Sequence, residues 1–431
     1  MKGKKKSMKF ATALRSYTAK RLEEIEKADI LVGIPSYNNE KTIAHVIQMV
    51  SHGLHKHFKN NRSVIMVADG GSTDDTREVA KEFEIKPWQE KIVSIYRGKP
   101  GKGSALRSIF EAATRLQVKA CAVVDSDLRS ITSDWVLYLI SPVLYKGYQF
   151  VAPIYTRYKY DATITNNIVY NLTRALYGKR IRQPIGGDFA FSPDMAKFYI
   201  EDDVWETDVA YYGVDIWMTT SAITQGKKIC QANLGLKIHD VKDPSYDLGP
   251  MFRQIIWTLF SLMERYETFW KNVKDSEEVE TFGTISTQEP DPINIDLERL
   301  VNRFKMGFNQ FGVLWKEIFS SECYKEIELS AKLSVQDFWI SVDEWVMILY
   351  ELAATFHAWP INRRRLIDLS TPLYYARVAA FVNQTKDMDS LEAEKIVEQQ
   401  ALIFEYHKDY LIELWDKSKG KAKALSEKLY M

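Results

Sequence analysis

The sequence has few cysteines and no long apolar run. Its 431 residues contain three cysteines, scattered without the close spacing of a metal-binding motif, which argues against a disulfide-stabilised fold and a cysteine-based metal site. No apolar segment approaches the roughly 18–20 residues that a transmembrane helix needs. No apolar stretch follows the basic N-terminal residues, as a secretory signal would require. We therefore expect a cytoplasmic protein with no transmembrane segment.

The chain also lacks a dominant charge and two common nucleotide-binding motifs. Lys+Arg 58 and Asp+Glu 57 leave a formal net charge of +1, so no overall positive field indicates a nucleic-acid partner. The glycines of the loop at 97–104 do not have Walker A spacing, and no Gly-x-Gly-x-x-Gly pattern follows the first apolar run. The second absence counts against binding of NAD or FAD.

Short apolar runs alternate with helical patterns in the first half of the chain. The runs are typical of buried strands and lie at 30–34, 64–68, 92–96, 120–124 and 150–155. Helical periodicity is found at 8–28, 40–52, 73–84 and 103–117. Alternation at this spacing predicts an α/β domain with a mainly parallel sheet and right-handed crossovers.

Strand signals fade after about residue 245. Apolar residues between 297 and 311 trace one helical face, and Ser341 with Glu344 predicts a capping box at the start of a later helix. The polar segment 274–292 indicates a linker or a mobile loop. We predict an N-terminal helical extension at 1–28, an α/β domain at 29–245 and an all-helical C-terminal domain at 246–431.

Four loops that follow the predicted strands carry residues suited to a nucleotide diphosphate. They are Pro35-Ser36-Tyr37-Asn38-Asn39-Glu40, Asp69-Gly70-Gly71-Ser72-Thr73-Asp74-Asp75-Thr76, Arg97-Gly98-Lys99-Pro100-Gly101-Lys102-Gly103-Ser104 and Asp125-Ser126-Asp127. Glycines let a backbone approach a ligand closely, and exposed amides beside Lys102 at a helix start would cradle phosphates. Two carboxylates at a strand end can hold Mg2+ or Mn2+. Taken singly, each loop also fits a plain turn or a capped strand–helix junction.

In this order, the four loops resemble the nucleotide-diphospho-sugar half of GT-A glycosyltransferases. That resemblance implies a Rossmann-like GT-A sheet domain. It places the base and ribose of the donor near Pro35, Tyr37, Glu40 and Asp69. It also places Lys102 near the donor phosphates and the metal on Asp127, with Asp125 nearby.

The second half of the α/β region narrows the resemblance. The block 147–166 is followed by Gln183-Pro184-Ile185-Gly186-Gly187-Asp188, by Tyr212-Gly213-Val214-Asp215 and by His239. This order is similar to that of the mannosylglycerate synthase and glucosylglycerate synthase group, which are retaining GT-A enzymes with a helical C-terminal domain. The resemblance covers about 30–240 and is only architectural beyond. Tyr212 departs from it, since a tryptophan is expected there.

The resemblance implies a role for each matching residue. Asp127 and His239 would bind Mg2+ or Mn2+, with oxygens of the donor diphosphate completing the coordination. Arg157 and Thr165 would hold the acceptor, and Asp215 would lie at the reacting sugar and the acceptor. Gly186 and Gly187 would let the chain pass close to the donor sugar. Lys102 and Asp215 are the expected catalytic residues, and Asp125 would contact the donor.

The implied activity is transfer of mannose or glucose from a nucleotide-sugar to a small hydroxy acid such as D-glycerate, with retention. The product would be a compatible solute of the mannosylglycerate or glucosylglycerate type. The donor would be GDP-mannose or GDP-, ADP- or UDP-glucose, between which the sequence does not choose. Association into a homo-oligomer is also left open.

The main alternative is an inverting family 2 glycosyltransferase that acts on a polysaccharide or a lipid-linked acceptor. It would use a carboxylate in the 206–215 region as a general base. Two residues also have simpler interpretations. Arg157 could pair with Asp161 at the surface, and His239 could be an ordinary loop histidine.

Overall fold

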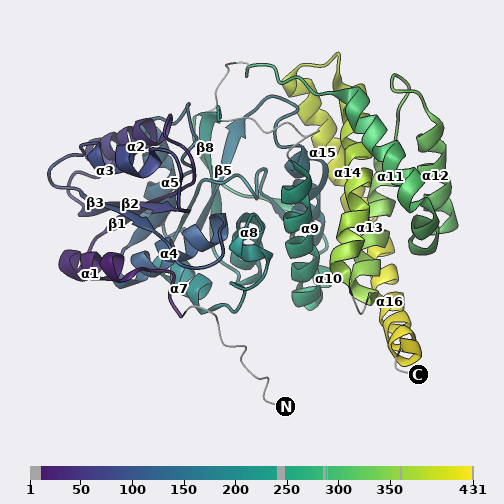
Figure 1. Cartoon of the computed structure of the whole chain (residues 1–431), viewed down its shortest axis with the longest axis horizontal. Coiled ribbons are helices and arrows are strands. Elements are labelled where there is room, and N and C mark those ends of the chain that lie inside the picture. The colour runs from purple at the N-terminus through teal and green to yellow at the C-terminus, as the bar shows by residue number, and fades with distance from the viewer. Residues whose placement is uncertain (1–10, 240–247, 285–287, 289, 360–361, 430–431) are drawn as a thin grey trace. The chain divides into compact units, whose positions relative to one another are not determined.

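The computed structural model describes residues 11–239, 248–284, 288, 290–359 and 362–429 (Figure 1). The chain forms two compact units that are interleaved in sequence. Unit 1 comprises Met1–Thr156, Ile181–Asp240 and Val279–Pro290, and unit 2 comprises Arg157–Arg180, Val241–Glu278 and Asp291–Met431. The domain boundaries predicted from the sequence stay a prediction, because compact packing does not establish which segments fold independently.

Unit 1 is built on an eight-stranded sheet with the order β10-β8-β5-β7-β4-β1-β2-β3. Its strands are β1 (Ile30–Ser36), β2 (Ser63–Asp69), β3 (Glu90–Ile95), β4 (Ala120–Val123), β5 (Phe150–Thr156), β7 (Phe189–Phe191), β8 (Ile229–Leu236) and β10 (Thr281–Gly283). Among the strands that the structure describes in this sheet, β7 alone runs antiparallel to its neighbours. The predicted Rossmann-like sheet, mainly parallel, is confirmed.

Helices cover both faces of this sheet. The helices are α1 (Ser16–Ile25), α2 (Ile43–His57), α3 (Thr76–Glu82), α4 (Lys102–Arg115), α5 (Ser133–Lys146), α7 (Pro193–Glu201) and α8 (Val214–Thr224), with a 3-10 turn at Asp208–Ala210. In Figure 1, α2, α3 and α5 lie on one face and α4 and α7 on the other. The helix predicted at 8–28 is shorter than expected, because 11–15 are not helical.

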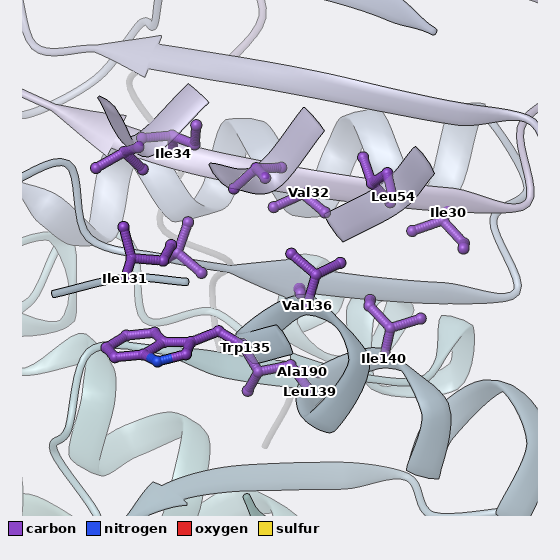
Figure 2. Close-up of a cluster of buried hydrophobic side chains, with 14 of the residues drawn as sticks. Ile30, Val32, Ile34, Leu54, Ile131, Trp135, Val136, Leu139, Ile140 and Ala190 are labelled. Carbon is purple, nitrogen blue, oxygen red and sulfur yellow. The ribbon is translucent and has the colours of Figure 1, made fainter. Parts of the chain in front are cut away.

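The core on the α2 and α5 face is continuous and mainly aliphatic. Ile30, Val32 and Ile34 project from β1 toward Trp135 and Val136 of α5 (Figure 2). All residues of β1 and of β2 are buried, as is typical of strands covered by helices on both faces. Burial of each aliphatic side chain contributes about 1.5–3 kcal/mol to the stability of the fold. This packing holds in place the strand ends from which the site loops start.

The segment 274–292 is not the simple linker that its polarity predicts. It contains β9 (Glu277–Glu278), which pairs with β6 (Lys179–Arg180), and β10, which extends the large sheet by pairing with β8. Both strands are very short, and their residues are mostly exposed. Such edge strands carry no apolar alternation, so the sequence pattern did not reveal them.

Unit 2 is mainly helical, as predicted, and also contains the short paired strands β6 and β9. Its helices are α6 (Tyr170–Tyr177), α9 (Leu248–Arg265), α10 (Glu267–Asn272), α11 (Leu297–Ile318), α12 (Ser321–Lys332), α13 (Val342–Ala358), α14 (Arg363–Thr385), α15 (Ser390–Tyr406) and α16 (Lys408–Leu429). The predicted capping box is present, because Ser341 and Glu344 exchange side-chain and backbone hydrogen bonds at the start of α13. Within the part of the chain that the structure describes, no helix combines the length and apolarity needed to cross a membrane.

A π-helical turn at Thr165–Val169 precedes α6 and is held by side chains of later helices. Gln400 Nε2 donates to the carbonyl of Asn166 at 2.6 Å, and Trp345 Nε1 donates to the carbonyl of Asn167 at 2.8 Å. The fully buried Arg377 guanidinium donates to Gln400 Oε1 at 2.7 and 3.1 Å and to Asn167 Oδ1 at 3.1 Å. Burial lowers the pKa of Arg377 to about 9, so the side chain stays charged at neutral pH. These bonds stabilise an otherwise rare turn.

We expect Gln400→Leu to lower the free energy of unfolding by about 1.5–3 kcal/mol, because a buried guanidinium loses a hydrogen-bond acceptor. Gln399 is exposed on the same helix, so Gln399→Leu is a matched control with an expected change within about 0.5 kcal/mol. Chemical denaturation of both variants measures the difference. Equal stabilities would show that the network does not hold the π-helical turn.

Candidate active site

The predicted loops meet at one edge of the unit 1 sheet. The parallel register pairs Ser36 at the end of β1 with Asp69 at the end of β2. It also pairs Gly33 of β1 with Val123 at the end of β4. The carboxyl ends of these strands therefore lie side by side, where open α/β sheets bind their ligands.

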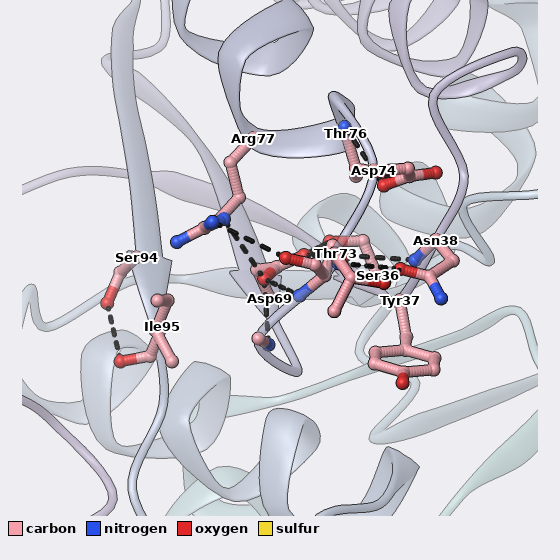
Figure 3. A network of polar contacts seen from close by, with 12 residues as sticks. Ser36, Tyr37, Asn38, Asp69, Thr73, Asp74, Thr76, Arg77, Ser94 and Ile95 are labelled. Atoms are coloured by element: carbon pink, nitrogen blue, oxygen red, sulfur yellow. Dashed lines mark hydrogen bonds and ion pairs between the residues drawn. The ribbon is translucent and has the colours of Figure 1, made fainter.

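Asp69 orders the loop between β2 and α3. Its Oδ1 accepts hydrogen bonds from the amides of Gly71 and Ser72, both at 2.8 Å. Its Oδ2 accepts from the hydroxyls of Ser36 at 3.0 Å and Ser72 at 2.5 Å, and Arg77 Nε lies 3.7 Å from Oδ1 (Figure 3). The carboxylate is fully buried among these partners. Its contact with a base or ribose stays a prediction, and its contacts in the structure are those of a residue that shapes the loop.

The other residues predicted to bind the base lie on the first loop. Pro35 is buried within β1, whereas the Tyr37 side chain is 60% exposed and Glu40 is also exposed. Glu40 Oε2 accepts a hydrogen bond from the amide of Asp75 at 3.3 Å, which joins the first loop to the second. The exposed ring of Tyr37 is therefore the part of this loop that is available to stack on a ligand.

The glycine loop before α4 differs from the open phosphate cradle that we predicted. The amide of Gly101 donates to the hydroxyl of Tyr96 at 2.9 Å, and the amide of Gly103 donates to the carbonyl of Tyr211 at 3.2 Å. A Cβ at Gly103 would lie 1.7 Å from the carbonyl oxygen of Val209. The glycines therefore serve close packing against 209–211, and those two amides are already occupied. The Lys102 ammonium is the group on this loop that is suited to a phosphate.

Lys102 lies between two carboxylates. Its Nζ is 2.9 Å from Asp125 Oδ1 and 3.2 Å from Asp215 Oδ2. Burial alone would lower the pKa of Lys102, but the charges of Asp125 and Asp215 raise it well above its usual value. Burial raises the pKa of Asp215 despite the nearby lysine. Asp215 Oδ1 is buried and accepts no hydrogen bond from the described part of the chain.

Asp125 contacts a second lysine that the sequence reasoning missed. Lys237 Nζ lies 3.2 Å from Asp125 Oδ2 and 2.9 Å from Asp188 Oδ2. Burial would raise the pKa of Asp125, but Lys102 and Lys237 together hold it well below its usual range. A signal was available, because Lys237 is two residues before His239 at the end of an apolar strand. A single lysine at a strand end is too common to be singled out.

Asp127 and His239 are brought together, as predicted. His239 Nδ1 lies 4.0 Å from Asp127 Oδ2, and both side chains are partly exposed, at 18% and 27% respectively. Burial and the charge of Asp125 raise the pKa of Asp127. No group of three or more histidine, cysteine, aspartate or glutamate side chains suited to a metal occurs among the described residues. One carboxylate and one imidazole fit a Mg2+ or Mn2+ ion that takes further oxygens from its substrate.

Gly186 and Gly187 lie beside Asp125. Gly187 has φ +94°, and a Cβ there would be 2.1 Å from Asp125 Oδ2. The carbonyl oxygen of Gly186 accepts a hydrogen bond from Lys237 Nζ at 2.9 Å. The two glycines therefore make room for the carboxylate within the protein, and their approach to the donor sugar stays a prediction.

The two predicted acceptor residues belong to unit 2. Arg157 directly follows β5, and its Nη1 lies 3.4 Å from Asp161 Oδ2. The ion pair that we considered as the alternative role of Arg157 is therefore formed, although the side chains are only 13% and 14% exposed. Thr165 is buried at the start of the π-helical turn. Binding of an acceptor by either residue stays a prediction.

Three comparisons show which known proteins this chain is similar to. Residues 31–206 match the model of Glycosyl transferase family 2. A glucosyl-3-phosphoglycerate synthase of Petrotoga mobilis is 26% identical over 265 residues, which cover 57% of this chain and 77% of that protein. A crystal structure of glucosyl-3-phosphoglycerate synthase from Mycobacterium tuberculosis with Mn2+, UDP and glucosyl-3-phosphoglycerate has a TM-score of 0.43. Its sequence identity is 26%, over 57% of this chain and 85% of that chain.

The sheet, the strand-end loops and the family match together define a GT-A glycosyltransferase. Residues 31–206 match the model of glycosyltransferase family 2, and the chain is a hexosyltransferase with a nucleotide-sugar-binding domain. The resemblance to the mannosylglycerate and glucosylglycerate synthase group is confirmed by the similarity to glucosyl-3-phosphoglycerate synthase. The family model covers the four loops that the retaining and inverting interpretations share, so it does not separate them.

We expect Gly187→Ala to reduce affinity for the nucleotide by roughly ten- to a hundredfold, because the new Cβ displaces the Asp125 carboxylate. Gly226 provides a matched control, since it also has a positive φ of +64° but has no atom within 4 Å of an added Cβ. Both variants carry a backbone strain of about 1–2 kcal/mol. Calorimetric titration with nucleotide should therefore separate them, and equal losses would contradict the explanation.

Proposed function

We propose that this hexosyltransferase moves mannose or glucose from a nucleotide-diphospho-sugar to a small hydroxy acid such as D-glycerate, with retention of the anomeric configuration. The observation that carries the proposal is the placement of Lys102 between Asp125 and Asp215, whose buried Oδ1 accepts no hydrogen bond from the described part of the chain. A cation for a leaving diphosphate and an acceptor for a substrate hydroxyl are thus adjacent. The similarity to a glucosyl-3-phosphoglycerate synthase supports an acceptor of the glycerate type.

The reaction breaks the bond between the anomeric carbon and the phosphate oxygen and forms one to a hydroxyl oxygen of the acceptor. In a retaining reaction on one face of the sugar, the hydroxyl proton passes to the leaving phosphate oxygen. Lys102 offsets the negative charge that develops on the diphosphate, and this type of electrostatic stabilisation is often the largest catalytic contribution. Asp215 orients the sugar or the acceptor through Oδ1.

Asp127 and His239 are the residues that would hold Mg2+ or Mn2+. When bound, the ion supplies positive charge that neutralises the leaving diphosphate. Asp125 lies near this pair but is already bonded to two lysines, so it is better suited to order the donor than to bind the ion directly. Tyr37, Glu40 and the loop ordered by Asp69 would receive the base and ribose.

Arg157 and Thr165 would bind the acceptor, and their assignment rests on the family resemblance. A guanidinium can bind a carboxylate through two parallel hydrogen bonds, which suits a small hydroxy acid. Engagement of an acceptor by Arg157 would compete with its contact to Asp161. D-glycerate and 3-phosphoglycerate are the two acceptors to compare, because the second corresponds to the product named for the Petrotoga relative.

The second candidate function is inverting transfer to a polysaccharide or a lipid-linked acceptor. One observation favours it: burial raises the pKa of the Asp215 carboxyl, and a raised pKa suits a general base that removes a proton from the acceptor hydroxyl. The anomeric configuration of the product, determined by NMR, distinguishes the two. An inverted product would exclude the retaining mechanism and would make Asp215 a candidate for the general base.

We expect Asp127→Asn to reduce turnover by roughly a hundredfold or more and to weaken Mn2+ binding in calorimetry, because a charged metal ligand is lost. His239→Ala should weaken Mn2+ binding in the same assay. Asp134 is a control carboxylate, since its ion-pair partners are Lys56 and His57, neither of which is a predicted metal ligand. Asp134→Asn should leave both properties unchanged. Full turnover in excess EDTA would contradict metal dependence.

We expect Arg157→Lys to raise the KM for D-glycerate by roughly tenfold or more, with a much smaller change in the donor KM, because lysine cannot make the bidentate contact. Asp161→Asn is the control, since it removes the ion pair and leaves the guanidinium. If the pair were the main role of Arg157, both variants would behave alike. Glycerol should be a poor acceptor, because it lacks the carboxylate. Equal kcat/KM for glycerol and D-glycerate would refute the hydroxy-acid proposal.

A further inference from the structure

Lys237 is a buried lysine whose hydrogen-bonding capacity is fully used at the active site of unit 1. It directly follows β8 and is 6% exposed. Its ammonium donates to Asp125 Oδ2 at 3.2 Å, to Asp188 Oδ2 at 2.9 Å and to the carbonyl oxygen of Gly186 at 2.9 Å. An ammonium has three N–H donors, so each is satisfied by one of these oxygens. Lys237, which follows β8, therefore connects this strand to Asp125 after β4 and to Asp188 before β7.

Asp188 completes this arrangement from the other side. Its Oδ1 accepts the backbone amide of Asp125 at 2.7 Å, and its Oδ2 accepts hydrogen bonds from Lys237 and from the hydroxyl of Tyr155. The ring centroid of Tyr155 also lies 4.7 Å from the Lys237 ammonium, within the range of a cation–π interaction. The backbone and the side chain of Asp125 are thus both fixed by the pair Asp188 and Lys237.

The two lysines that touch Asp125 are not equivalent. Lys102 contacts Asp125 and Asp215 and is the lysine expected to meet the donor phosphates, so its contacts must change when a donor binds. Lys237 has no N–H left for a ligand. When Lys102 turns toward a diphosphate, Lys237 still compensates the charge of Asp125 and holds its Oδ2 in place.

We propose that Lys237 is a positioning residue for the donor site, which keeps Asp125 in place while Lys102 engages the donor diphosphate. The inference rests on the proposed function for the role of Lys102 and extends it to a residue that makes no substrate contact itself. It predicts that loss of Lys237 weakens binding of the donor and leaves binding of the acceptor unchanged. Among the described residues, the Lys237 ammonium donates to Asp125, Asp188 and Gly186 and to none of Asp127, His239, Arg157 and Thr165.

The test compares Lys237→Met with Lys159→Met. Lys159 is a buried lysine of unit 2 whose ammonium donates to the carbonyl oxygens of Thr385, Lys386 and Met388 and lies 5.1 Å from the ring centroid of Tyr160. Both substitutions therefore remove three hydrogen bonds and at least one cation–π contact, since Lys159 also lies 5.9 Å from the ring centroid of Tyr158, and both should lower the melting temperature. UDP, GDP and ADP are titrated into each variant and the wild type by calorimetry with Mg2+.

The expected result is a roughly ten- to a hundredfold loss of nucleotide affinity in Lys237→Met, with the affinity of Lys159→Met unchanged. In steady-state kinetics the donor KM of Lys237→Met should rise while the acceptor KM stays the same. Unchanged nucleotide affinity in Lys237→Met, or an equal loss in Lys159→Met, would overturn the proposal. Lys237→Gln retains N–H donors for the buried oxygens and serves if the methionine variant does not fold.

Failure of the proposed function gives a different result. If the wild type binds none of the three nucleotides, the assignment of the donor site is wrong. The crystal structure of Lys237→Met then still decides the positioning role, because the methionine side chain has no N–H donor for the Asp125 carboxylate. The proposal requires that the Asp125 carboxylate leaves its position beside Gly187 in that variant, and an unmoved carboxylate would refute it.

Discussion

Compensation of buried charge at Asp125 is the constraint on which the site depends. Each of its oxygens lies within 3.2 Å of a different lysine ammonium, Lys102 at Oδ1 and Lys237 at Oδ2. Those lysines in turn contact Asp215 and Asp188, so charges of opposite sign alternate across the ends of several strands. A buried charge that lost its partner would be costly. The strand-end loops must therefore approach closely, and glycines at 103 and 187 leave the space for them to do so.

Much of the fold and the first four loops could be predicted because their signals are local. The apolar runs in the sequence predict β1, β2, β3, β4 and β5, and the residue at which each run ends predicts where the following loop begins. The capping pair Ser341 and Glu344 is also a local pattern, and it is present. The proximity of Asp127 and His239 came from the family resemblance, since no local rule joins residues so far apart in sequence.

The remaining features depend on contacts between distant segments. The amides of Gly101 and Gly103 look open in the sequence, but residues 96 and 211 occupy them. The partnership of Lys237 with Asp188 needs the register of β5, β7 and β8, which periodicity does not give. The π-helical turn exists because Gln400 and Trp345 bond its carbonyls across more than 170 residues of chain. Each is a tertiary effect that overrides the local pattern.

The interleaving of the two units has a consequence for how the chain is made. Synthesis proceeds from the N-terminus, and the edge strand β10 follows β8 only after α9 and α10 of unit 2. At typical rates of about 5–20 residues per second, β10 is synthesised several seconds after β8, the strand with which it pairs. Segment 157–180 likewise emerges long before the helices that surround it. Neither unit corresponds to one uninterrupted stretch of the chain. Truncation alone therefore cannot isolate either unit, because its separate segments would also have to be joined.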